Sequence, residues 1–268
     1  MIELNQKLEF AKNTALSAGE ILMKHFGNLK NVRNKSRVDL VSEADLAAEK
    51  QIVKMIMEKF PEYDIVTEEQ DFEAKGSDWQ WIIDPLDGTT NYVHSLPIFA
   101  VSIGLKYKNE TVIGVVYNPA ENELYHAIKG MGAFKNDNQI KVSKVKKLGN
   151  ALLVTGFPYE HNNEWELNFD LFRDIYRNTQ GIRRLGAAAL DFCYVAQGRF
   201  DGFFEINLFP WDICAGDLIL KEAGGFTCGW KGESLPDSGK KVLATNGLIQ
   251  DQILAIINTK KYQLFTNY

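Results

Sequence analysis

The order of helical and strand-like patterns is the feature that most limits how this 268-residue chain can fold. Apolar residues recur at helical spacing over residues 3–26 and 45–59, which predicts two helices. Ser42 followed by Asp45 suits the start of the second helix, and Pro61 follows its end. The chain therefore opens with two helices before any strand-like segment.

Strands follow, first together and then mixed with helices. Strands are predicted over 63–69 and 78–84, and an antiparallel meander is predicted over 98–107, 111–119 and 122–128. In the second half, strands are expected near 151–157, 200–206, 225–229 and 241–246. Helices are expected over 163–178, 187–197, 212–223 and from 247. This irregular order favours a layered mixed α/β sandwich over a doubly wound parallel sheet.

Composition places the chain among globular proteins, with 45% hydrophobic and 24% charged residues. Because no stretch has the composition of a linker, we treat residues 1–268 as one domain with halves of about 1–145 and 146–268. No segment reaches the ~20 consecutive apolar residues of a membrane span, and the N-terminal stretch lacks the apolar block of a signal peptide. We expect a cytoplasmic protein with no membrane partner.

Charge and cysteine content argue against several functional classes. The net charge of −5 gives no general basic field, so a nucleic-acid partner is not expected. Cys193, Cys214 and Cys228 are odd in number and form no C-x-x-C pair, so we interpret them as buried small residues. The four histidines lack H-E-x-x-H spacing, which argues against a zinc hydrolase.

The segment "WIIDPLDGTTN", residues 81–91, ends an apolar strand with two aspartates, Asp84 and Asp87. A β-turn is the simplest interpretation of "DPLDG". However, Glu68 and Glu69 end the preceding predicted strand, and Asp212 opens a later helix, so several carboxylates would converge. Two unit charges 4 Å apart repel by roughly 4 kcal/mol at an effective dielectric of 20. Oxygen ligands without His or Cys favour a hard cation such as Mg²⁺ as the compensating charge.

The residues after the two aspartates suit an anion. In "GTTN", glycine and hydroxyl residues stand where a strand passes into a short helix, and exposed N–H groups at a helix start bind phosphate well. Metal-binding carboxylates beside a phosphate site indicate phosphoryl chemistry.

Two long segments, "WIIDPLDGTTN" and "PWDICAGDLILKEAGG", resemble the paired signature of the inositol monophosphatase family, which are magnesium-dependent, lithium-sensitive sugar-phosphate phosphatases. The resemblance continues through "VDLVSEAD", "GVVYNPAENELYHAIKGMGAFKN", "GIRRLGAAALDFCYVAQGRFDGFFE" and "VLATN", so it covers nearly the whole chain in order. It implies the alternating αβαβα sandwich of inositol monophosphatases and fructose-1,6-bisphosphatases, and a homodimer.

The resemblance also implies two to three Mg²⁺ ions in each active site. One ion would be bound by Glu68, Asp84 and the carbonyl oxygen of Leu86. A second would be shared by Asp84, Asp87 and Asp212, and a third, weaker ion would also contact Glu68. Paired ions, typically ~3.5–4 Å apart, lower the pKa of a water molecule and hold the attacking and leaving oxygens in line.

In similar enzymes a threonine and an aspartate orient the attacking water, and these match Thr89 and Asp45. With Glu68 they form the predicted catalytic group. Asp45 also suits a helix cap, and it could serve both purposes. Gly88 and Thr89 would present backbone N–H groups to the phosphate, and Asp212 is expected to contact the substrate as well.

Three further substrate contacts are implied by the resemblance. Glu205 would bind a substrate hydroxyl, the backbone of Ala188 would contact the ring, and Lys35 would lie near the phosphate. The residues alone also allow a solvent-exposed strand end for Glu205, helix packing for Ala188 and a solvated Lys35. For Arg183 and Arg184 we favour a structural or interface role over a phosphate clamp.

The expected activity is hydrolysis of inositol monophosphate (myo-inositol 1-phosphate) or a similar small polyol or sugar phosphate, a phosphomonoester. Only 15 residues separate Glu68 from Asp84, a connection as short as that of the simple monophosphatases. Alternative activities are those of a fructose-1,6-bisphosphatase, an NADP phosphatase or a histidinol-phosphate phosphatase. An alternative of another class is a non-catalytic regulatory protein with the same fold that binds RNA machinery.

Overall fold

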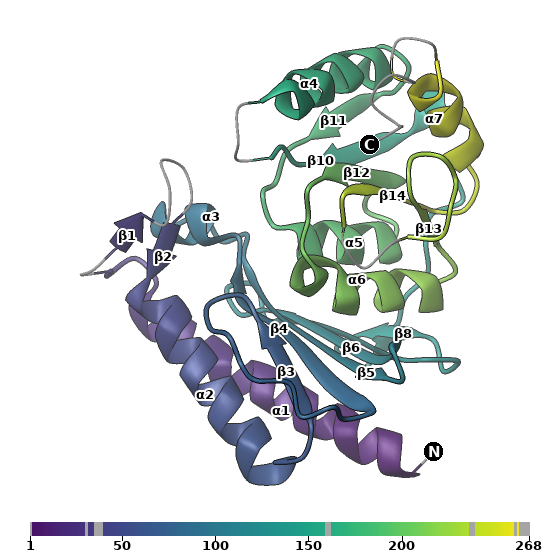
Figure 1. The fold of residues 1–268 in the computed structure, drawn as a ribbon. Helices are drawn as coiled ribbons and strands as arrows, with labels where there is room; N and C mark the ends of the chain where they lie inside the picture. The colour runs from purple at the N-terminus through teal and green to yellow at the C-terminus, as the bar shows by residue number, and fades with distance from the viewer. Residues whose placement is uncertain are drawn as a thin grey trace.

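The structure is a computed structural model that describes residues 2–29, 32–34, 40–158, 162–235, 239–259 and 262 (Figure 1). Helices and sheets alternate in five layers, which Figure 1 shows from the helices near the N-terminus to those at the top of the view. Among the described residues, no helix is both long enough and apolar enough to cross a membrane.

The first layer consists of α1 (Ile2–His25) and α2 (Glu43–Lys59), which pack against each other and against one face of a sheet. Their buried faces include Leu22 and Ile52, in a core shared with the strands. The predicted start of α2 is confirmed, because Ser42 and Asp45 form a reciprocal capping box there.

The second layer is a seven-stranded sheet in the order β3-β4-β5-β6-β7-β8-β9. β3 and β4 are parallel and every later neighbour is antiparallel, so the meander is confirmed. The strands are β3 (Asp64–Thr67), β4 (Trp79–Asp87), β5 (Ala100–Tyr107), β6 (Glu110–Asn118), β7 (Glu123–Ile128), β8 (Ala133–Lys135) and β9 (Asn138–Gln139).

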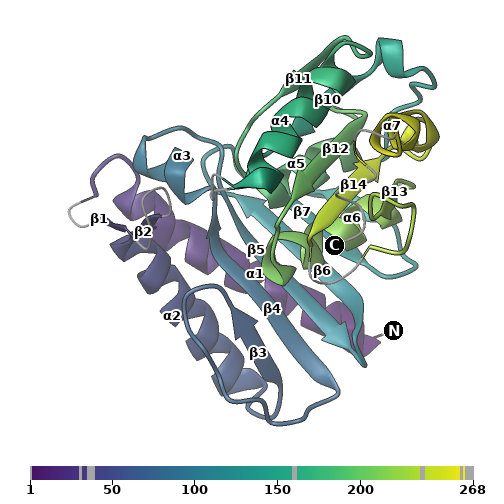
Figure 2. The ribbon, with the colours of Figure 1, turned by 45° about the horizontal axis from the view of Figure 1, so that its top comes forward.

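The third layer, α5 (Ala188–Ala196) and α6 (Pro210–Glu222), lies between the two large sheets (Figures 1 and 2). α6 approaches β5 and β6 closely because the strands have glycines beneath it. A Cβ at Gly104 would lie 2.4 Å from Cys214 Sγ, and one at Gly114 would lie 2.6 Å from the carbonyl oxygen of Ala215. These two glycines, in the middle of their strands, therefore allow α6 to lie close against the sheet.

The fourth layer is a five-stranded sheet in the order β11-β10-β12-β14-β13, in which β10 is parallel to both of its neighbours. Its strands are β10 (Leu152–Thr155), β11 (Gly181–Arg183), β12 (Gly202–Ile206), β13 (Phe226–Cys228) and β14 (Lys241–Thr245). The last layer is formed by α4 (Asn163–Tyr176) and α7 (Gln250–Ile257). The predicted αβαβα fold is confirmed.

Several short elements were not predicted from the sequence. They are β1 (Val32–Asn34), β2 (Leu40–Ser42), the 3-10 helix η1 (Leu148–Asn150), β8, β9 and β11. The short helix expected after "WIIDPLDG" is α3 (Thr89–Val93). The prediction that the second strand ends at residue 84 was wrong, because β4 continues to Asp87. All three cysteines are buried and free, as expected.

Candidate metal centre

The end of β4 presents two aspartates because the strand is bulged there. The register with β5 pairs Asp84 with Ser102 and Asp87 with Ala100, so it shifts between the two aspartates. Pro85 lies inside this shift, which suits proline because it has no N–H for a regular ladder. "DPLDG" is therefore a bulged strand end and not a β-turn, and Asp84 and Asp87 are both buried.

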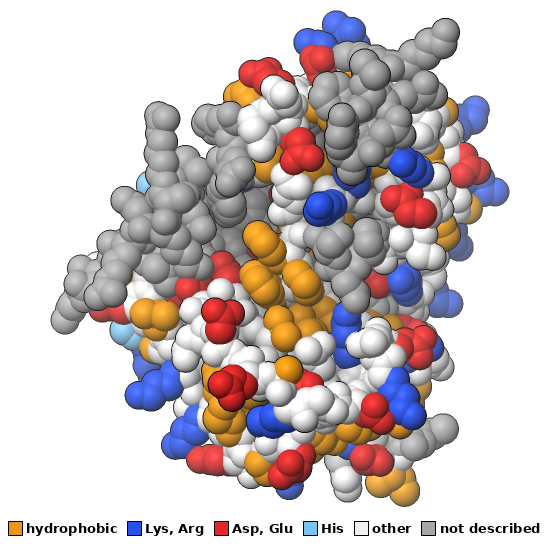
Figure 3. Space-filling view, viewed as in Figure 1, with side chains coloured by type: hydrophobic (Ala, Val, Ile, Leu, Met, Phe, Trp, Pro, Cys, Tyr) orange, Lys and Arg blue, Asp and Glu red, His pale blue; other side chains and the backbone are white. Residues whose placement is uncertain are grey.

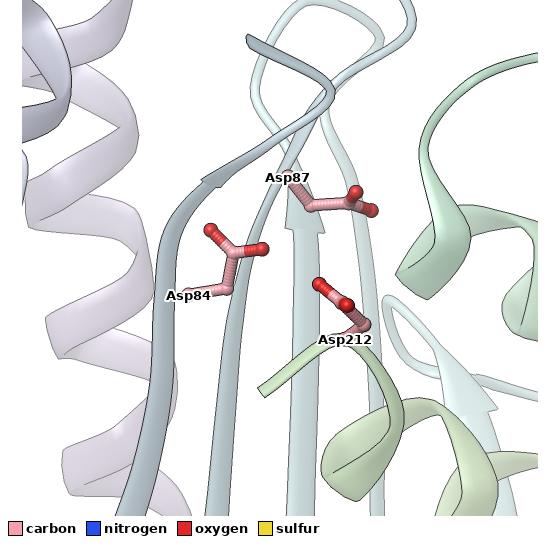
Figure 4. Close-up of side chains that lie close together, drawn as sticks. All are labelled: Asp84, Asp87 and Asp212. Atoms are coloured by element: carbon pink, nitrogen blue, oxygen red, sulfur yellow. The ribbon is translucent and has the colours of Figure 1, made fainter. Parts of the chain in front are cut away.

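Three carboxylates meet at this strand end. Asp84, Asp87 and Asp212 each offer one oxygen, and these oxygens all lie within 4.8 Å of one another (Figure 4). Asp212 comes from the first turn of α6, on the neighbouring layer. Ser102, opposite Asp84 on β5, donates its hydroxyl to the carbonyl oxygen of Trp211 at 3.1 Å, which holds this turn over the strands.

Backbone N–H groups orient each of the three carboxylates. Asp84 Oδ1 accepts from the N–H of Leu86 at 2.9 Å, and Asp212 Oδ2 accepts from the N–H of Phe209 at 2.7 Å. Asp87 accepts from Ala188 at 3.1 Å and from Ala189 at 2.8 Å, at the start of α5. The cluster thus joins β4 to both helices of the third layer.

The electrostatics of the cluster are unfavourable without a cation. Burial raises the pKa of Asp84 and Asp212 well above the usual range of a carboxyl, and the negative charges of Asp87 and Glu68 raise both further. Burial also raises the pKa of Asp87 to about 7, although the N–H groups of Ala188 and Ala189 oppose the shift. Protonation or a bound cation would relieve this repulsion.

Glu68 lies just after β3 and outside the tight group of three oxygens. Its negative charge nevertheless contributes to the raised pKa values of Asp84, Asp87 and Asp212. Glu68 therefore lies near enough for its charge to act on the three aspartates. The predicted convergence is observed for Asp84, Asp87 and Asp212, whereas Glu68 and Glu69 do not belong to the group of clustered oxygens.

Thr89 and Asp45 are 44 positions apart in the sequence, and the fold brings their side chains into contact. The hydroxyl of Thr89 lies 3.2 Å from Asp45 Oδ1 and 3.0 Å from the carbonyl oxygen of Leu86, and it can donate to one of them at a time. Asp45 also accepts from the backbone N–H of Ser42 at 2.9 Å, so it is both a helix cap and a partner of Thr89. Burial raises the pKa of Asp45.

The turn after β4 requires a glycine. Gly88 precedes α3 with φ of 89°, in the left-handed region, and a Cβ there would lie 2.9 Å from the carbonyl oxygen of Ile98. The N–H of Ala188 is used by Asp87, and the side chain of Ala188 is packed in the core. Lys35 lies outside the described residues.

Glu205, near the end of β12, lies beside a second group of charges. Burial raises its pKa to about 8, and the positive charge of Arg184 opposes that shift. Asp191, on α5, is buried, and neither of its carboxyl oxygens has a hydrogen-bond partner among the described residues. Its pKa is raised well above the usual range, mainly by burial and then by Glu205.

Arg184 and Asp191 were not predicted as site residues. The positive charge of Arg184 acts to lower the pKa of both Glu205 and Asp191, so its guanidinium lies near these two carboxyl groups. The sequence analysis favoured a structural or interface role for Arg184, because the motif around it in similar proteins supports the fold and the dimer. Asp191 gave no signal, since a single acid in a helix is ordinary.

The donor chemistry suits a hard divalent cation. The clustered ligands are carboxylates only, and among the described residues no His or Cys belongs to the group. Buried anions that lie this close favour a bound cation, and oxygen donors favour Mg²⁺ over the softer transition metals. On the face in Figure 3, acidic and basic side chains of the described surface are interspersed, without a broad basic area.

Comparisons with known proteins agree with this arrangement. The model of the inositol monophosphatase family matches residues 3–262. A protein of Aquifex aeolicus named fructose-1,6-bisphosphatase/inositol-1-monophosphatase is 42% identical over 265 residues, 98% of each chain. A Pasteurella multocida protein named Nus factor SuhB is 41% identical, over 92% of this chain and 94% of its own length. The structure of an inositol monophosphatase from Anabaena superimposes with a TM-score of 0.87 at 38% identity, covering 95% of this chain and 96% of the other.

Proposed function

The chain belongs to the inositol monophosphatase family, and we propose that it is a Mg²⁺-dependent phosphomonoesterase acting on inositol monophosphate or a similar small polyol or sugar phosphate. The observation that carries this proposal is the cluster of three carboxylates within 4.8 Å, of which Asp84 and Asp87 are buried and Asp212 is partly buried. A protein without a cation partner gains nothing from burying these charges together, because their repulsion and desolvation both cost stability.

In this proposal Glu68, Asp84 and the carbonyl oxygen of Leu86 hold one Mg²⁺, and Asp84, Asp87 and Asp212 hold a second. A third ion would also contact Glu68. When bound, the ions lower the pKa of the attacking water and neutralise charge on the phosphoryl oxygens. The N–H groups that orient Asp84, Asp87 and Asp212 keep these carboxylates in place before a cation arrives.

Thr89 and Asp45 orient the attacking water. When the Thr89 hydroxyl donates to Asp45, its oxygen lone pairs are available to accept a proton from a water molecule. The raised pKa of Asp45 suits a carboxylate that takes the proton of the Thr89 hydroxyl while that hydroxyl takes a proton from the water. Thr89 is only partly buried, so a water molecule can reach it.

The rest of the substrate is bound by groups on both sides of the cluster. The N–H groups of Gly88 and Thr89 contact the phosphate, with Asp212 beside it. Glu205 accepts a hydrogen bond from a hydroxyl group of the leaving alcohol. The charge of Asp87 raises the pKa of Glu205, so Glu205 lies near the cluster, which supports this role. The backbone of Ala188 is assigned a contact to the ring of the substrate. The role of Lys35 near the phosphate rests on the family resemblance alone, because Lys35 lies outside the described residues.

Relatives with other names support two alternatives. The name of the Aquifex aeolicus relative supports fructose-1,6-bisphosphate as a second substrate. NADP and histidinol phosphate are the other phosphate esters to test. Relatives named Nus factor SuhB support a regulatory binding role on the same fold, with or without catalysis. Lithium inhibition, a homodimer and a cytoplasmic location belong to the main proposal, and lithium titration and light scattering check the first two.

Phosphate release from inositol 1-phosphate, fructose 1,6-bisphosphate, NADP and histidinol phosphate tests the proposal, with each substrate assayed in Mg²⁺ and in EDTA. Asp87→Asn should abolish release, because one amide oxygen cannot replace a carboxylate at the second ion. Asp201→Asn is the control, since Asp201 is buried and hydrogen-bonded to Leu152 away from the cluster. Release that survives EDTA, or an Asp87→Asn variant as active as the parent, would refute the metal assignment.

A further inference from the structure

α2 carries two buried carboxyl groups one helical turn apart, Asp45 and Glu49. Residues four apart lie on the same face of a helix, and the side chains of these two are 1% and 0% exposed. Both belong to the face of α2 that packs on the ends of β3 and β4. Asp45 was predicted as a site residue, whereas Glu49 was not.

Glu49 holds the turn that carries Glu68. Its Oε2 accepts the backbone N–H of Glu69 at 3.0 Å. That N–H belongs to the peptide unit joining Glu68 to Glu69, so the bond fixes the direction in which the chain leaves β3. Glu68 in turn acts on Asp84, Asp87 and Asp212 through its charge.

Helix stability does not explain an acid at position 49. The other oxygen, Oε1, is buried and has no hydrogen-bond partner among the described residues. A buried carboxyl group with one unsatisfied oxygen costs stability, and an apolar side chain would be more favourable in this core. The polar groups that act on Glu49 are the N–H of Glu69 and the side chains of Thr67 and Gln70, all in the segment around Glu68, so the benefit of Glu49 comes from its interactions with that segment.

We propose that Glu49 is a positioning residue that holds Glu68 in the geometry required to bind a divalent cation. Asp45 fastens the other turn through Thr89, at 3.2 Å. α2 thus fixes the two turns relative to each other, one after β3 and one after β4. This inference rests on the proposed function, since it assumes that Glu68 is a ligand.

Glu49→Leu and Glu49→Gln separate positioning from stability. Leucine removes the acceptor and the buried polar atoms together, so Glu49→Leu should keep or raise the melting temperature. Its metal affinity should fall at least about tenfold, because a metal ligand that loses its hydrogen-bonded support usually binds the ion that much more weakly. Glutamine keeps an acceptor oxygen for Glu69, so its affinity should stay within about threefold of the parent, because the hydrogen bond survives.

Asp64→Ala is the matched control. Asp64 is also buried, at the opposite end of β3, and it accepts the backbone N–H groups of Lys75 at 2.6 Å and Ser77 at 3.1 Å. Its removal should lower the melting temperature and leave metal affinity unchanged. Metal affinity is measured without substrate, from the loss of the free-ion EPR signal when Mn²⁺ is added to metal-free protein, and Mg²⁺ activation of phosphate release is measured in parallel.

Two results would overturn the inference: Glu49→Leu binding Mn²⁺ as tightly as the parent, or Glu49→Gln losing as much affinity as Glu49→Leu. The second result would mean that charge, and not the hydrogen bond, matters. Failure of the proposed function looks different, because the parent protein itself would then bind no Mn²⁺ and release no phosphate; the inference would fall with it.

Discussion

Replacing Asp84 by asparagine removes one negative charge from the middle of the carboxylate cluster. The amide oxygen of the new side chain can still accept the N–H of Leu86, so the local backbone bond is kept. The charges of Glu68, Asp87 and Asp212 all act on Asp84. We therefore expect Asp84→Asn to stabilise the metal-free protein and to destabilise it relative to the parent when Mg²⁺ is present.

The size of the effect follows from the separation of the charges. At 4.8 Å, the largest separation in the cluster, and an effective dielectric of about 20, each ionised pair repels by about 3.5 kcal/mol, so two fully ionised pairs repel by about 7 kcal/mol or more. The folded protein can instead retain protons. A pKa raised from 3.8 to about 7, as for Asp87, corresponds to about 4 kcal/mol above pH 7. Because retaining a proton limits the cost in this way, we expect a gain of about 2–4 kcal/mol at pH 8.

Urea unfolding followed by tryptophan fluorescence measures this difference at pH 8 in EDTA and in Mg²⁺. Mg²⁺ at a thousandfold excess over its Kd should stabilise the parent by about 4.1 kcal/mol, and Asp84→Asn much less. This is at least as large as the expected gain of the variant, so the order of the two proteins reverses. Asp201→Asn, outside the cluster, should differ from the parent equally in both buffers. A less stable Asp84→Asn protein in EDTA would refute the electrostatic reasoning.

Three further predictions concern the site. Thr89→Val should lower kcat about 10²-fold or more, while Thr89→Ser keeps most activity, because serine retains the hydroxyl near Asp45; steady-state kinetics at saturating Mg²⁺ decide this. Gly156→Ala should raise KM without changing the Mg²⁺ dependence of the activity, since a Cβ at this position would lie 2.0 Å from Glu205 Oε1. Gly149→Ala is the control and should have no effect, because the space around Gly149 is open. Without metal, stability should fall as pH rises from about 4 to 7, because the folded protein keeps protons on Asp87 that the unfolded chain releases, and urea midpoints that rise over this range in EDTA would contradict it.

The layers of the fold were predictable from the sequence because the long elements have clear periodicity. α1, α2 and the meander β5-β6-β7 each repeat a pattern over several turns or strands. β11, with three residues, is too short to show one. The continuation of β4 past Asp84 was missed because its pairing depends on a bulge against β5, a tertiary feature.

The acids at the ends of strands could be predicted, but their supports could not. Asp84, Asp87 and Asp212 stand in recognisable segments, and the topology brings them together. The N–H groups of Ala188 and Ala189 that hold Asp87 come from a helix 101 and 102 residues away, and nothing in their own sequence marks them as donors. Glu49 was detectable in principle, because it lies four residues after Asp45 on the same helical face.

The cluster draws Asp84 and Asp87 from the first half of the chain and Asp212 from the second, so its geometry is complete only when both halves have folded. A nascent chain that has built only α1, α2 and the seven-stranded sheet holds two of the three acids, without the helix turn that brings the third. Contacts between residues so distant in sequence are slow to form, because closing the intervening chain costs entropy. Tight cation binding therefore reports that both halves have assembled, and depletion of the cation should loosen the junction between the two sheets before it disturbs either sheet alone.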